Sequence, residues 1–176
     1  MPENGFWYRN HINPDFMFGF KGKAFLYDKR LVPDETPKQL IKYDLLFSKA
    51  KDSRSYWKLR KTKIAKLKKL RSSKITFEKS IVWKLSLKIF TLAIVNGSYL
   101  RKYFDPHFIQ GGQTKVYSYI PRGFFIVEKA LDRREIPVVF MHEILEYFLM
   151  SPKRNYQRSH DIADKLERHI RKIMFT

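Results

Sequence analysis

The sequence contains no cysteine and no long apolar run. Without cysteine, disulfide bonds, thiolate zinc ligands and a cysteine nucleophile are excluded, so histidine, aspartate or glutamate would have to hold any metal ion. The longest clean apolar segment, Ile89–Val95, is far too short to cross a bilayer. The first ten residues lack the basic and apolar blocks of a secretory leader. We therefore expect a cytoplasmic protein without a membrane span.

Acidic residues are also scarce. The chain of 176 residues has 17 Asp and Glu against 36 Lys and Arg, a formal net charge of +19. Residues 49–74 hold twelve basic residues and one acidic residue, whereas residues 131–176 hold nine basic and seven acidic. A positive field of this strength favours an anionic partner. We expect a basic, aromatic-rich region at 1–104 and a second, nearly neutral region at 105–176, as two units or as one continuous domain.

Apolar residues at helical spacing predict four helices. They are expected from Thr36 to about Ala50, from Tyr56 to Leu70, from Pro137 to about Met150 and from Tyr156 to Met174. The second of these is lysine-rich and amphipathic. In the last helix the residues expected to face the core are Ile162, Ala163, Leu166, Ile170 and Ile173. Residues 1–32 have no sustained period and indicate loops and short strands.

Alternating apolar residues predict strand structure from Trp83 to Val95, with Asn96–Gly97 as a reversing turn, although these residues also fit a helical period. Lys115–Ile120 and Phe124–Val127 are expected to form a hairpin through Pro121–Gly123. Together the elements indicate an α+β fold. Its small, mostly antiparallel sheet would be packed by the helix of residues 137–150 and by the C-terminal helix, beside a basic helical N-terminal region.

The helix expected at residues 137–150 contains the candidate chemistry. It is apolar almost all round except at His142, Glu143, Glu146 and the Tyr147 hydroxyl. His142 and Glu146 are four residues apart and project from the same face, while Glu143 flanks them. Burying carboxylates without a cation costs several kcal/mol. We therefore expect a positive group, such as a metal ion, at this face.

The next helix offers a third ligand. An antiparallel turn after Met150 would bring His160 back over the first helix. Two imidazoles and one carboxylate, with one coordination position left for water, form the ligand set of a catalytic zinc site, and Fe²⁺ or Mn²⁺ also suits this set. Asp161 or Asp164 could orient the His160 ring, or Asp164 could replace it as a ligand. The predicted metal ligands are His142, Glu146 and His160.

The motif His142-Glu143-Ile144-Leu145-Glu146 resembles the HExxH helix of zincin metallopeptidases in a variant form, HExxE. The resemblance covers about residues 123–167 and includes the strand expected at Phe124–Val127. It implies that Glu143 is the general base, that His142, Glu146 and His160 hold zinc, and that the chain is a peptidase-like hydrolase acting on a peptide or protein. The departure is that Glu replaces the second motif His, and His160 stands where many members have Glu.

Alternatives to these roles remain open. His142, Glu143 and Glu146 could be a buried polar cluster paired with Arg or Lys from the basic half, and His160 could be a capping or core histidine. The chain would then be a basic nucleic-acid-binding protein with a structural C-terminal helical pair. Lysines and aromatic residues interleave at residues 49–74, which suits phosphates and bases but also a solvated face. No helix-turn-helix, zinc-finger or RNA-recognition signature accompanies them.

Overall fold

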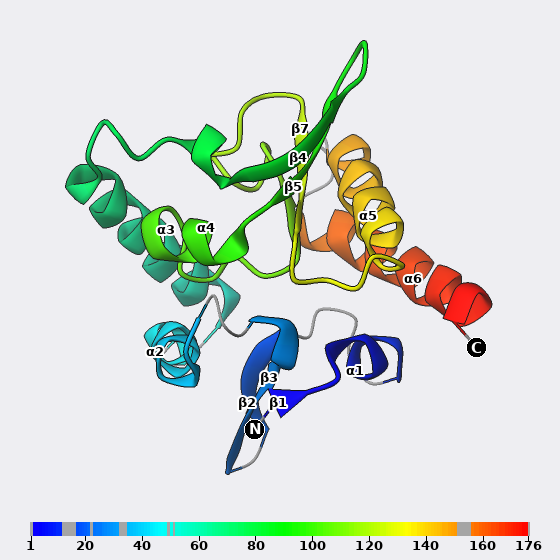
Figure 1. The fold of residues 1–176 in the computed structure, drawn as a ribbon, viewed down its shortest axis with the longest axis horizontal. Coiled ribbons are helices and arrows are strands. Elements are labelled where there is room, and N and C mark those ends of the chain that lie inside the picture. Colours follow the sequence, from blue (N-terminus) through cyan, green and yellow to red (C-terminus); the bar gives the residue numbers. More distant parts are fainter. Residues whose placement is uncertain are drawn as a thin grey trace.

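The computed structural model describes residues 2–11, 17–21, 23–31, 35–48, 50, 52–150 and 156–175. It confirms the α+β fold class. Figure 1 shows a larger sheet with α5 and α6 on one side and α3 and α4 on the other, and a smaller N-terminal sheet beside it.

The N-terminal part builds the small sheet and two long helices. Its elements are β1 (Pro2–Glu3), α1 (Gly5–His11), β2 (Phe18–Lys21), β3 (Ala24–Asp28), the 3₁₀ helix η1 (Lys29–Leu31), α2 (Pro37–Phe47) and α3 (Ser53–Leu70). The strand order is β1-β3-β2. Thr36 and Asp52 cap α2 and α3 through reciprocal hydrogen bonds with Gln39 and Ser55. The two helices thus begin close to where their sequences predict.

The larger sheet follows. Its elements and neighbours are η2 (Phe77–Ser80), β4 (Ile81–Ser86), β5 (Thr91–Val95), α4 (Gly97–Tyr103), β6 (Gly111–Gln113) and β7 (Phe124–Glu128). The strand order is β4-β5-β7-β6, with β4–β5 and β6–β7 antiparallel and β5–β7 parallel. The sheet is therefore mostly antiparallel, as predicted. It takes strands from both sides of residue 104, and the division of the chain at that residue stays a prediction.

Two strand predictions need correction. The segment from Trp83 to Val95 is a hairpin of β4 and β5, and Asn96 makes no reversing turn because its side chain accepts from the Tyr99 amide and caps α4. Residues 115–120 form turns, and the antiparallel partner of β7 is β6 instead. Gln113 causes this, because its side-chain and main-chain oxygens accept from the amides of Lys115 and Tyr117 and fold the chain back.

The last two helices are α5 (Ile136–Leu149) and α6 (Tyr156–Phe175), which match the predicted ranges closely. The predicted turn between them, at residues 151–155, lies outside the described residues. Alternate residues of β7 face opposite sides of the sheet, so that Phe125 and Val127 pack toward α5 while Ile126 packs toward α4. The sheet and α5 together form the frame of the site described below.

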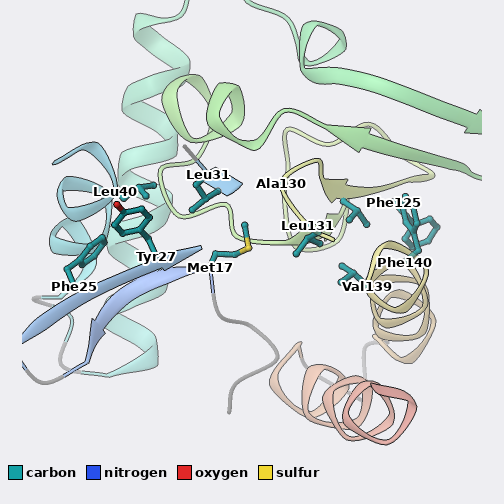
Figure 2. Packing of buried hydrophobic residues seen from close by; sticks show 11 residues of the cluster. Met17, Phe25, Tyr27, Leu31, Leu40, Phe125, Ala130, Leu131, Val139 and Phe140 are labelled. Atoms are coloured by element: carbon teal, nitrogen blue, oxygen red, sulfur yellow. The ribbon is translucent and has the colours of Figure 1, made fainter. Parts of the chain in front are cut away.

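One hydrophobic cluster joins the two parts of the chain. Figure 2 shows Met17, Tyr27 and Leu31 of the N-terminal part in the same cluster as Val139 and Phe140 of α5. The described residues of this N-terminal segment thus pack onto the C-terminal part of the chain. The helix α1 in that segment was not predicted, and its Arg9 is buried against Glu135, which precedes α5.

Candidate metal centre

Helices α5 and α6 lie antiparallel. Glu146, near the end of α5, meets His160 near the start of α6, and Glu135 before α5 meets Arg171 near the end of α6. This arrangement places the motif residues of α5 against a row of polar side chains on α6. The structure thereby brings together all three predicted metal ligands.

The ligand atoms form a compact triangle. His142 Nε2 lies 3.2 Å from His160 Nδ1 and 3.8 Å from Glu146 Oε2, and His160 Nδ1 lies 2.9 Å from Glu146 Oε2. Ligand atoms about 2.0–2.2 Å from a tetrahedral zinc ion stand about 3.3–3.6 Å apart. The three separations scatter around that value. The group could therefore hold a metal ion with little rearrangement.

The other nitrogen of His142 faces α6. His142 Nδ1 lies 2.7 Å from Glu167 Oε2 and 3.6 Å from Asp164 Oδ1. Glu167 is in turn held by Arg171, whose Nε donates to it over 2.7 Å. A carboxylate on the far nitrogen fixes the orientation of a ligating imidazole and makes it more basic. Although His142, Asp164 and Glu167 also form a possible metal-holding group, Arg171 already offsets the charge of Glu167, so we favour the first group.

The cluster of ionisable groups shifts the pKa values of its members. Burial lowers the pKa of His142, but the Glu146 and Glu167 carboxylates outweigh burial and raise it to about 11. Burial raises the pKa of Glu146, but His142, His160 and Gln113 hold it below its ordinary value. At neutral pH the carboxylates therefore favour a proton, and so a positive charge, on His142. A bound metal cation would take the place of that proton.

Glu146 is anchored from the sheet as well. Gln113 of β6 is fully buried, and its Nε2 donates to Glu146 Oε1 over 2.9 Å. Because Gln113 occupies one carboxylate oxygen, the other oxygen is left to His160 and to the proposed ion. The sequence prediction missed Gln113, since its pairing depends on the strand β6, which has no recognisable strand pattern.

Glu143 lies next to the triangle, buried between α5 and β6. Burial raises its pKa, and the Glu146 carboxylate raises it further. The chain has glycine at residue 111, where a Cβ atom would stand 2.6 Å from Glu143 Oε1 and 2.8 Å from Val139 Cγ1. Gly111 therefore leaves the space in which the Glu143 carboxylate sits. The expected general base is thus held beside the ligands, at the wall of a cavity.

That cavity has a volume of about 510 Å³ and is lined by His142, Glu143, Glu146 and His160 together with residues of the basic helix. The helix α3 contributes Tyr56, Trp57 and Arg60 to the opposite wall. Tyr156 completes the aromatic wall, stacked on the His160 ring at 5.3 Å and edge-on to Trp57. A ligand in the cavity would meet both the candidate metal centre and the aromatic side chains.

Within the described residues, no Arg or Lys of the basic half pairs with His142, Glu143 or Glu146. Arg60 reaches the cavity from α3, but its guanidinium bonds Asp105, with Nη2 2.6 Å from Oδ2. His107 bonds the Tyr56 hydroxyl through Nδ1 at 2.6 Å. Its burial is the main cause that lowers its pKa to about 4.

Other candidates from the sequence have different surroundings. Asp161 is exposed and accepts from Gln157, so it does not orient His160. Asp164 Oδ1 lies 3.8 Å from His160 Nε2, too far for a direct hydrogen bond. Tyr156 lines the cavity, whereas Tyr147 packs edge-on against Phe125.

The predicted inner face of α6 is wrong for three of its five residues. Ile162, Leu166 and Ile173 are 38%, 43% and 71% exposed, whereas Ile170 is half-buried and Ala163 is buried with four polar residues. These are Ser159, Asp164, Glu167 and Arg171. Counting from His160, the three charged residues of this group fall at spacings of four, three and four. A search for polar residues at helical spacing would have found Glu167 and Arg171.

No protein-family model, no curated protein and no solved structure matches this chain. Within the described residues, no helix has the length and apolar character needed to cross a membrane. The cytoplasmic location stays a prediction.

Proposed function

We propose that this protein is a metal-dependent hydrolase, with zinc as the first candidate ion and His142, Glu146 and His160 as its ligands. The single observation that carries the proposal is the triangle of ligand atoms at the wall of the 510 Å³ cavity, with the Glu143 carboxylate beside it. The resemblance to zincin peptidases supports a peptide or protein as substrate and belongs to the same proposal.

The roles follow from the positions of the side chains. A zinc ion held by these ligands would supply Lewis acidity, polarising a carbonyl and lowering the pKa of water to about 7. Glu143 is buried beside the ligands and would take the proton from the attacking water and pass it to the leaving group. Glu167 would hold the His142 ring in place through Nδ1. Tyr156 stacks on His160 and would shield that ligand from solvent.

Glu143→Gln tests this assignment. The variant should keep its zinc, because Glu143 is not one of the ligands, and should lose hydrolytic activity by about 100-fold or more, because the general base is gone. Hydrolysis would be screened with zinc-loaded protein on a denatured-protein mixture, with new peptide ends detected by mass spectrometry. The exposed Glu78 provides a matched control as Glu78→Gln.

Equal hydrolysis by wild type and Glu143→Gln would contradict the general-base role. Zinc-loaded wild type that releases no new peptide ends would contradict the peptidase reading, and ester and phosphodiester substrates would then be screened with the same pair of proteins. If zinc were instead bound by His142, Asp164 and Glu167, the Glu146→Ala variant would keep its full zinc content, which would contradict the proposed ligand set.

Nucleic-acid binding through residues 49–74 is the second candidate function. The observation that favours it is a group of lysines around one cavity, to which α3 contributes Lys63 and Lys66. Lys49 and Lys51 lie outside the described residues.

A further inference from the structure

A second cavity lies between α2, α3 and α4, on the side of α3 that continues from the aromatic wall of the first. Its volume is about 360 Å³. Lys42 of α2, Lys63 and Lys66 of α3, and Lys102 of α4 line it. We call this cavity the basic cleft. Three separate helices thus place four ammonium groups around one hollow.

The charge of the basic cleft is not neutralised from within. No Asp or Glu lines it, and among the described residues none of the four lysines has an ion pair with a carboxylate. Arg101 at its floor adds no free charge, because Glu35 and Glu128 hold it. Four like charges around a hollow repel one another, so an anion in the cleft would be stabilising.

The floor of the basic cleft is apolar and aromatic, with Tyr43 and Leu67 among its residues. A simple anion would use the lysines and leave this floor bare. A nucleotide offers both parts, a phosphate for the ammonium groups and a flat base or sugar for the floor. The hollow shape suits a chain lying in it better than a membrane surface.

The inner side of α3 connects the two cavities. Tyr56 and Arg60 line the first cavity, while Lys63, Leu67 and Leu70 line the basic cleft. Their spacings of four, three, four and three residues put them on one face of the helix. At about 1.5 Å per residue the stripe is about 21 Å long, which is longer than one nucleotide. A strand, and not an isolated nucleotide, would fill this surface.

We propose that the basic cleft binds the phosphates of a single-stranded nucleic acid that follows the inner side of α3. The inference rests on the second candidate function and not on the proposed hydrolase, because none of the four lysines belongs to the candidate metal centre. It is tested in the presence of a chelator, so that it stands or fails separately from the metal.

The probe is a fluorescein-labelled oligothymidylate of 20 nucleotides, with binding followed by anisotropy across a salt series. Four phosphate contacts predict a slope of about −2.8 in log affinity against log salt for wild type. Lys63→Gln/Lys66→Gln should reduce the slope by about 1.4 and weaken binding roughly 25-fold in 0.1 M salt. These lysines are exposed or half-buried and unpaired within the described structure, so circular dichroism should show an unchanged fold.

The matched control is Lys58→Gln/Lys61→Gln. It removes the same charge from the same helix at exposed positions that line neither cavity, and it should weaken binding less than about threefold. Equal losses in the two double variants would overturn the proposal, since net charge alone would then explain binding. So would wild type that fails to bind the oligonucleotide, or that binds vesicles with 30% phosphatidylserine through Lys63 and Lys66 and ignores the oligonucleotide.

Discussion

At the scale of single residues, the two ring nitrogens of His142 have different neighbours, one set in the proposed ligand triangle and the other on α6. Nε2 faces Glu146 and His160, while Nδ1 faces Glu167. A neutral core histidine needs a donor opposite its unprotonated nitrogen. Here carboxylates, which only accept, face both nitrogens, and this fits an imidazole surrounded by groups that favour a cation.

The sequence predicted His142, Glu143, Glu146 and His160 as one group because helical spacing and one antiparallel turn are enough to bring them together. It did not predict Gln113, which donates to Glu146 from a strand of three residues. The two residues are 33 positions apart, and their contact depends on how the whole sheet packs against α5. Local patterns hold no information about such a contact.

His107 makes the stability of the protein depend on pH. Burial and the nearby Arg60 lower its pKa from 6.5 to about 4, so it is neutral in the folded protein across that range. In the unfolded chain His107 binds a proton as the pH falls below 6.5, which favours unfolding. Its contribution should thus reduce the free energy of unfolding by up to about 3 kcal/mol between pH 6.5 and pH 4.

His107→Gln removes this titration while keeping a polar partner for the Tyr56 hydroxyl. Urea unfolding followed by circular dichroism, at several pH values in a chelator, should show a smaller loss of stability for the variant between pH 6.5 and pH 4. The exposed His169, as His169→Gln, is the control and should follow the wild-type curve. Parallel curves for all three proteins would contradict the assignment.

At the scale of elements, α6 shows why a helix can be located correctly while its buried face is misjudged. Apolar spacing gave its ends to within about a residue, but the face against α5 is mainly polar. Its buried positions are taken by Glu167, which faces His142, and by Arg171, which holds Glu167, while several apolar residues stay exposed. The same limit applies to β6, whose Gly-Gly-Gln sequence becomes a strand because it pairs with β7.

Glu167→Gln tests the orienting role of α6. A neutral amide cannot make the His142 ring more basic, so zinc affinity should fall by about 10-fold to 100-fold. Affinity would be measured by competition with a chromophoric chelator. Asp161→Asn changes an exposed carboxylate of the same helix and should leave the affinity unchanged. An unchanged affinity in Glu167→Gln would mean that Glu167 does not act through His142.

At the scale of the whole molecule, a chain of buried ion pairs connects the N-terminal part to the candidate metal centre. Arg9 bonds Glu135, Glu135 bonds Arg171, and Arg171 bonds Glu167, which faces His142. Removing one member of a buried pair typically costs about 3–5 kcal/mol, so this chain fixes the relative positions of α1, α5 and α6. Arg9 and Glu135 are 126 residues apart, which is why the sequence did not indicate the link.

The net charge of +19 is distributed unevenly over the molecule. The lysines of α3 project on the outer side and into the basic cleft, while the centre between α5 and α6 is rich in carboxylates. A cation and a polyanion would therefore bind at different places on one molecule. The charge counts of the two halves predicted this separation, although they could not show that α3 lines both cavities.

The measurement that tests the central claim most directly is the metal content of tag-free protein after zinc reconstitution and desalting, determined by inductively coupled plasma mass spectrometry. The account predicts close to one zinc ion per wild-type chain, and its loss in both His142→Ala and Glu146→Ala while circular dichroism shows that the helices persist. Wild type that retains no metal after reconstitution, or variants that retain as much as wild type, would contradict it.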